Sequence, residues 1–324
     1  MNAPARLGVY GLILAAVFTV AGLTASVVVP EETVQSWIEE APEDQHGAAA
    51  NDAQRHDGPS QTPDLDASSM GLASAQEGYQ LSITSAPAEQ GTLGELSLVV
   101  TGTEGDPVTD FELSHEQELH LIVVRADGEH FRHVHPDRNT DGVWTIPWEW
   151  PAGGSYRLYA DFVPADTGEA VTLSSTVQVA GDYTPAPAAE PVTETTVEGF
   201  RVSVEGELLA GKTSELTLTV TRGDEPVTDL EPYLGALGHL VALREGDLAY
   251  LHVHPHRDTA HPDETAGPEI TFEVTAPTVS HYLLYLDFQV DGEVHTAALA
   301  LTATAADEDA AQQNPDQEAE DDDH

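Results

Sequence analysis

The stretch ELHLIVVRADGEHFRHVHP, residues 118–136, decides the fold of this chain. A run of Leu, Ile and Val residues leads to Asp127-Gly128, and a second segment continues from there to Pro136. Branched aliphatic residues favour β-strands, and Asp-Gly is a strong signal for a two-residue hairpin turn. We therefore expect an antiparallel hairpin in which residues whose numbers sum to 255 face each other.

The expected register brings three histidines together. His120 faces His135, and Ile122 faces His133. Because side chains alternate between the two faces of a strand, the three imidazoles lie on one face, where opposed Cβ atoms are about 5 Å apart. Three imidazole nitrogens at this spacing are typical ligands of Zn(II), Cu(II) or Ni(II).

The same pattern recurs in GHLVALREGDLAYLHVHP, residues 238–255. With a turn at Gly246-Asp247, His239 faces His254, and His252 lies diagonally across the hairpin. The triad is thus repeated within one chain although many neighbouring positions differ. The sequence therefore predicts two His triads, which bind metal either as one site per copy or as one shared site.

Other residues are expected near each triad. Phe131 and Tyr250 fall on the histidine faces and form an apolar wall. The motifs YADF and YLDF place Asp161 and Asp287 inside otherwise apolar strands, where a carboxylate needs a partner. We predict each aspartate as a metal ligand, with a contact that supports a ligand, or a buried structural hydrogen bond, as the alternatives. Among the other histidines of the two copies, His115, His130, His281 and His295 are not expected to bind.

The repetition extends over about 100 residues, which indicates a duplicated domain. Each copy contains about seven short segments rich in Val, Leu, Thr and Tyr, separated by Gly, Asp and Pro, without a helical period. This predicts an all-β chain with two tandem immunoglobulin-like antiparallel β-sandwich domains, a barrel being the alternative. We place the copies at residues 78–183 and 196–305, joined by a linker over 184–195.

The N-terminal part of the chain has the pattern of a membrane anchor. Residues 7–29 carry no charge and suffice for a transmembrane helix, which leaves residues 1–6 as a cytoplasmic stub. Residues 30–77 and 306–324 are expected to be a disordered acidic linker and a disordered acidic tail. We expect a single-pass protein of the cell membrane with extracytoplasmic domains, or a secreted protein if a signal peptide is cleaved near Ala25.

Composition excludes several classes of function. The 324 residues include no Cys, which excludes disulfides, thiolate metal sites and Cys nucleophiles. The formal net charge of −46 disfavours nucleic acid as a partner, because such a charge repels polyanions. Without Cys, any chemistry must come from His, Asp, Glu, Ser or Tyr. Metal binding by His is expected to weaken below about pH 6.5, where a free imidazole gains a proton.

The stretch ELHLIVVRADGEHFRHVHP, followed by GGSYRLYADF, resembles a group of secreted or membrane-anchored bacterial proteins that share the His-x-His-Pro motif. Some of them are encoded beside genes for efflux of copper or other heavy metals. The resemblance covers roughly residues 115–162 and, more loosely, 234–288. It implies extracytoplasmic metal handling. The second copy has Leu234 where the first has His115, which leaves a shared four-His site open.

We interpret the chain as a non-enzymatic metal-binding protein with a divalent transition metal, copper ahead of zinc. One alternative is a cell-surface interaction or spacer module with incidental histidines. A second is a bicupin-like metal-dependent oxygenase, since GDLAYLHVH resembles the first cupin motif. The cupin glutamate is absent at its expected spacing, because the first Glu after His254 is Glu264. Storage, delivery and sensing of the ion remain open, as do protein partners.

Overall fold

The computed structural model describes residues 70–306 except 189, 252 and 256–264, and of residues 254 and 255 it describes the backbone. Every named element in this part of the chain is a β-strand, which confirms the all-β prediction. No helix in it is long and apolar enough to cross a membrane. The expected stub, transmembrane segment and most of the acidic linker and tail lie outside the described residues.

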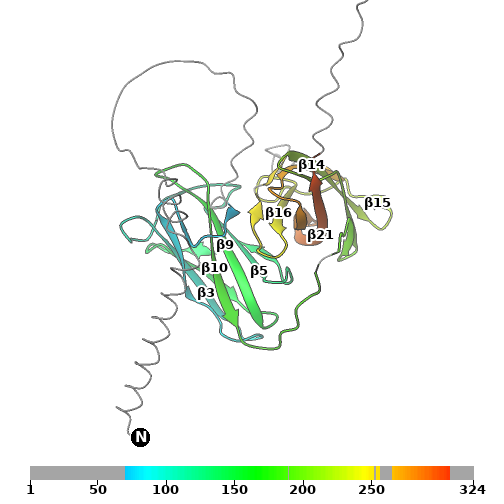
Figure 1. Cartoon of the computed structure of the whole chain (residues 1–324). Coiled ribbons are helices and arrows are strands. Elements are labelled where there is room, and N and C mark those ends of the chain that lie inside the picture. The colour runs from blue at the N-terminus through cyan, green and yellow to red at the C-terminus, as the bar shows by residue number, and fades with distance from the viewer. Residues whose placement is uncertain (1–69, 189, 252, 256–264, 307–324) are drawn as a thin grey trace, which may run out of the picture. The chain divides into compact units, whose positions relative to one another are not determined.

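The first copy folds into two antiparallel sheets, in which β10, β9 and β5 are neighbours (Figure 1). One sheet has the order β1-β2-β3-β8-β7, and the other has the order β10-β9-β5-β6, with β4 paired to β9. The strands are β1 (Ala75–Gln76), β2 (Tyr79–Ser85), β3 (Gly94–Thr101), β4 (Phe111–Glu112), β5 (Leu119–Arg125), β6 (Arg132–Val134), β7 (Asp137–Arg138), β8 (Val143–Trp148), β9 (Gly154–Pro164) and β10 (Val171–Val179).

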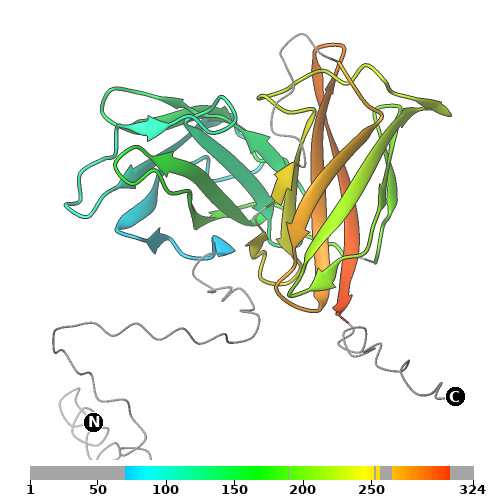
Figure 2. The same cartoon turned by 90° about the horizontal axis from the view of Figure 1, so that it is seen from above.

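The second copy, coloured yellow-green to red in Figure 2, repeats this plan. Its sheets have the orders β11-β12-β14-β19-β18, with β15 paired to β14, and β13-β21-β20-β16-β17. The strands are β11 (Glu194–Val197), β12 (Phe200–Glu205), β13 (Leu209–Ala210), β14 (Thr213–Arg222), β15 (Glu225–Pro226), β16 (Gly238–Arg244), β17 (Tyr250–Leu251), β18 (Val253–Pro255), β19 (Glu269–Thr275), β20 (Ser280–Val290) and β21 (Glu293–Ala305).

The strand order is that of an immunoglobulin sandwich. In immunoglobulin letters, β2, β3, β8 and β7 are strands A, B, E and D, and β10, β9 and β5 are strands G, F and C. The second copy has the equivalent order β12, β14, β19, β18 and β21, β20, β16. The predicted sandwich is therefore confirmed, and the barrel alternative is wrong because each copy has two separate sheets.

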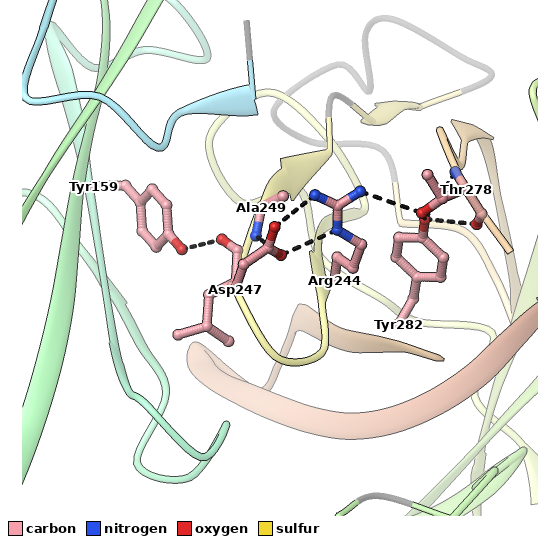
Figure 3. Close-up of polar contacts among 7 residues, drawn as sticks. Tyr159, Arg244, Asp247, Ala249, Thr278 and Tyr282 are labelled. Carbon is pink, nitrogen blue, oxygen red and sulfur yellow. Dashed lines mark hydrogen bonds and ion pairs between the residues drawn. The ribbon is translucent and has the colours of Figure 1, made fainter. Parts of the chain in front are cut away.

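A tyrosine corner supports the same assignment in both copies. The hydroxyl of Tyr156 donates to the carbonyl of Ala152 at 2.9 Å, and the hydroxyl of Tyr282 donates to the carbonyl of Thr278 at 2.9 Å (Figure 3). Each tyrosine lies near the start of strand F, where immunoglobulin folds use this bond to hold the preceding corner.

Each sandwich has its own apolar core, and a third apolar cluster lies between the copies. Leu121 and Val123 of β5 pack into the first core, whereas Ile122 and Val124 of the same strand point the other way. There they join Val241 and Leu243 of β16 and other buried residues of both copies. Both faces of β5 are therefore buried, the inner one by its own sandwich and the outer one by the second copy.

Each copy contacts the other through an aromatic ring and through a tyrosine hydroxyl. The ring of Phe131 stacks on Tyr285 of the second copy with centroids 4.0 Å apart, and the ring of Tyr250 lies 5.6 Å from Tyr159 of the first. The Tyr159 hydroxyl donates to the carbonyl of Leu248 (Figure 3), and the Tyr285 hydroxyl donates to the carbonyl of Gly128. The expected apolar wall thus belongs to the contact between the copies.

The first hairpin has the predicted register but a different turn. Ile122 pairs with His133, which confirms the sum of 255. Gly128 donates to the Arg125 carbonyl and Arg125 to the Glu129 carbonyl, so the loop has three residues and Gly128 has a φ of +84°. One extra residue then follows on the second strand, at His130 with a φ of +56°, and this bulge restores the register.

The second hairpin also keeps its predicted register, as Ala242 pairs with Leu251. Its loop has four residues rather than two, because Arg244 donates to the carbonyl of Ala249. The Arg244 guanidinium binds the Asp247 carboxylate within this loop (Figure 3). This four-residue loop, which contains the ion pair, takes the place of the two-residue turn expected at Gly246-Asp247.

We expect Ile122→Ala to destabilise the protein about as much as Leu121→Ala, by about 2–5 kcal/mol in the free energy of unfolding. The reason is that both side chains are buried, to 1% and 0% exposure, although they point to opposite faces of β5. Urea unfolding monitored by tryptophan fluorescence measures both. Leu113→Ala, at a residue 70% exposed, is the control. A negligible effect of Ile122→Ala would contradict the packing of the two copies.

Candidate metal centre

Three histidines of the first copy converge outside its apolar core. His120 lies on β5, His133 lies on β6, and His135 follows β6 directly. Nδ1 of His120 is 3.0 Å from Nε2 of His133 and 3.1 Å from Nε2 of His135. The three ring nitrogens lie within 4.8 Å of one another, as the hairpin register predicted.

The outer nitrogens of two of these rings are held by acceptors. Nε2 of His120 is 2.9 Å from the carbonyl oxygen of Ser114, and Nδ1 of His133 is 2.9 Å from Oδ2 of Asp287. A carbonyl and a carboxylate only accept hydrogen bonds, so each of these nitrogens carries the hydrogen. In the neutral rings, the inner nitrogens therefore present lone pairs. This is the arrangement of metal-binding histidines, whose second nitrogen donates to a carbonyl or a carboxylate.

Lone pairs that face each other at 3.0 Å repel unless a positive charge lies between them. A shared proton can interact with the lone pairs of two ring nitrogens, whereas a metal ion can coordinate all three. Tetrahedral Zn(II) with Zn–N bonds of about 2.05 Å places its ligand nitrogens about 3.3 Å apart, close to the distances from His120. The ring centroids of the triad form a nearly equilateral triangle with sides of 5.2, 4.9 and 5.0 Å.

The carboxylate that orients His133 comes from the second copy. Asp287 lies on β20, and its side chain and that of His133 are 4% and 5% exposed. Its other oxygen accepts a hydrogen bond from the Thr296 hydroxyl at 2.5 Å. Asp287 thus contacts a candidate ligand through that ligand's outer nitrogen.

Burial disfavours the charged form of His120, His135 and His239. It lowers the pKa of His120 to about 3, with further lowering by the neighbouring His133 and His135. Burial likewise lowers the pKa of His135 and of His239 to about 4, and His133 adds to both shifts. Neutral imidazole is the form that binds metal, so these rings are ready to coordinate at neutral pH.

His239 repeats the setting of His120. Its Nε2 lies 2.8 Å from the carbonyl oxygen of Tyr233, and Nε2 of His120 lies 2.9 Å from that of Ser114. His120 and Ser114 each lie 119 residues before their counterparts in the second copy. His239 does not join the triad, since its ring centroid is 6.2 Å from that of His133. The carbonyl groups of Ser114 and Tyr233 were not predicted from the sequence as partners of these histidines, although the same offset of 119 residues relates both pairs.

The remaining predicted residues are placed as follows. Asp161 lines a cavity of about 210 Å³ together with His120, His133 and His239, and it accepts a hydrogen bond from the Thr172 hydroxyl at 2.7 Å. His252 lies outside the described residues. The backbone of His254 pairs with Glu273 on β19 and not with His239, because the chain crosses to the other sheet after Leu251.

The histidines that were not expected to bind differ in position. His115 lines the cavity, and its ring lies 5.1 Å from that of His239. His130 lies elsewhere, with its ring 6.5 Å from that of Tyr156. His295 is buried and contacts Glu198 and the ring of Phe200, and neither it nor His281 is among the described residues that line the cavity.

The chain was compared with curated proteins, solved structures and protein families. No curated protein matches it. Among solved structures, the adhesin InvE of Yersinia pseudotuberculosis is similar at 14% identity, over 70% of this chain and 59% of that one, with a TM-score of 0.21. A putative membrane anchored protein from Corynebacterium diphtheriae has 8% identity over 72% and 60%, with a TM-score of 0.22.

This chain spans about six tenths of the length of those two chains. TM-scores of this size add nothing to the fold assignment, which rests on the strand order described above. A family described as "Domain of unknown function (DUF8832)" matches residues 73–181 and again residues 195–305. The chain therefore belongs to this family and carries two copies of its domain.

Proposed function

We propose that this protein binds a divalent transition-metal ion through His120, His133 and His135, with Cu(II) ahead of Zn(II). The observation that supports this most directly is that the outer nitrogens of two of the rings face hydrogen-bond acceptors. Ser114 and Asp287 provide these acceptors, so that the inner nitrogens of His120 and His133 are free to coordinate. Imidazole suits both ions, and the absence of Cys removes the thiolates that would favour Cu(I).

The proposed centre is one composite site rather than one site in each copy. The first copy supplies three ligands, and the second supplies the carboxylate of Asp287, which orients His133. Asp161 and His239 line the adjoining cavity from the two copies. In this proposal the second copy belongs to the site through Asp287, and none of its histidines coordinates the ion.

We propose that the protein binds the ion without turnover of a substrate. In support, the cavity of about 210 Å³ is smaller than the sites of about 300–1,000 Å³ that hold small organic molecules. We further propose an extracytoplasmic location, with residues 7–29 as the membrane anchor. The net charge of −46 favours the approach of cations to such a site.

We expect the full chain to bind one equivalent of Cu(II) or Zn(II) tightly, and His133→Ala to weaken this binding at least about a hundredfold, because it removes a ligand nitrogen. Isothermal titration calorimetry in 0.15 M salt measures both. His130→Asn is the control, since this residue does not line the cavity and Asn tolerates its positive φ. Uptake by wild type no stronger than by His133→Ala would favour a spacer module. Preference for iron or manganese with turnover would favour an oxygenase.

Asp287→Asn is expected to weaken metal binding about 10–100-fold, because the amide is a poorer acceptor for Nδ1–H of His133 than the carboxylate. The exposed Asp291, which pairs with Arg222, provides the control substitution Asp291→Asn. Equal affinities of the two variants would show that the contact across the copies does not contribute to the site.

Metal should remain bound at pH 6 and be released with a midpoint below about pH 5. Protons compete with the ion for the ring nitrogens, but burial lowers the pKa of His120 to about 3 and that of His135 to about 4. Release should therefore occur at lower pH than the value of about 6.5 expected for solvated histidine. Equilibrium dialysis across this range tests the prediction, and a midpoint near 6.5 would contradict it.

A further inference from the structure

A second pair of imidazoles lies beside the triad, with one ring from each copy. The centroids of His115 and His239 are 5.1 Å apart, and both residues line the cavity that His120 and His133 also line. His115 is exposed, His239 is half-buried and His120 is buried. The ring of His115 lies 6.2 Å from that of His120, and the ring of His239 lies 6.2 Å from that of His133. The pair thus connects solvent to the triad.

The backbone that carries His115 adopts a conformation rare for its residues. Ser114 and Gln117 exchange two hydrogen bonds around a two-residue turn, in which His115 and Glu116 have φ angles of +47° and +63°. Turns with two positive φ values favour Asn-Gly. In the second copy Gly235 occupies the second position of the equivalent turn. Non-glycine residues held in such conformations cluster at functional sites.

The two rings have free nitrogen atoms. Nε2 of His239 donates to the Tyr233 carbonyl, so Nδ1 carries a lone pair, and no described residue donates a hydrogen bond to it. The ring of His115 has no hydrogen bond to any described residue, and its centroid lies 6.2 Å from that of His120 and 5.1 Å from that of His239. Two imidazoles about 5 Å apart have the centroid separation that the triad also shows.

We propose that His115 and His239 form a capture subsite, which binds the divalent transition-metal ion from solvent before it passes to the triad. This rests on the proposed function. Two nitrogens and water hold the ion more weakly than the three nitrogens of the triad, so transfer inward is favourable. Because the pair contributes no ligand to the ion in its final position, it accelerates capture and release equally and leaves the equilibrium affinity unchanged.

The test is stopped-flow mixing of the full chain with Cu(II), followed by quenching of tryptophan fluorescence. Asn tolerates positive φ values, so His115→Asn keeps the turn while it removes the imidazole. His130→Asn is the matched control, because His130 has a φ of +56° and does not line the cavity. His239→Gln removes the second ring of the pair independently.

We expect His115→Asn and His239→Gln to slow the second-order rate of uptake about tenfold, with the stoichiometry and dissociation constant of wild type and an equally slowed release. His130→Asn should match wild type. Unchanged uptake rates in both variants would overturn the subsite and leave the proposed function standing. A loss of affinity like that of His133→Ala would also overturn it, since His115 or His239 would then be a ligand in the final site. Absence of binding by wild type would overturn both proposals.

Discussion

The burial of β5 and β16 on their outer faces is the constraint on which the rest of the molecule depends. The sheet that contains strand C of a lone sandwich has a face toward solvent, whereas here Ile122 and Val124 pack against Val241 and Leu243. Burial of an outer face has a consequence for every polar group placed on it. Polar groups removed from water need hydrogen-bond partners, and an unpartnered one is costly.

His120 and His133 meet that requirement with their outer nitrogens only. Ser114 and Asp287 accept those hydrogens, and the inner nitrogens face one another with His135. The low pKa of His120, about 3, has the same origin, because burial and neighbouring rings disfavour a charge on it. Packing of the copies thus excludes water from these rings and disfavours a charge on His120, whose neutral form is the one that the proposed metal binding requires.

The local part of this arrangement could be predicted from the sequence. Strand parity and the turn at Asp127-Gly128 are properties of neighbouring residues, so the convergence of His120, His133 and His135 followed from them. The details of the turn did not follow, because the bulge at His130 depends on the fit between two strands and not on the dipeptide. The register survived because the bulge compensates for the longer loop.

The contact between the copies was not predicted, although a signal was present. The strand LHLIVVR of residues 119–125 is almost continuously apolar, which is typical of a strand buried on both faces. Its partner could not be identified, because docking of two sandwiches depends on residues distant in sequence. The bond between His133 and Asp287, 154 positions apart, is of this kind. The departure of His254 to the other sheet likewise depends on where a strand crosses over.

The reciprocal bonds of Tyr159 and Tyr285 have a consequence for the ancestry of the protein. Each hydroxyl reaches a hairpin carbonyl of the other copy, as in the self-complementary contact of a two-fold symmetric dimer. A one-domain ancestor with this surface would cover it by pairing with an identical molecule. Fusion of two such genes makes that pairing intramolecular and independent of concentration. It also releases the halves from identity, and the two halves of this chain differ at the corresponding positions His115 and Leu234.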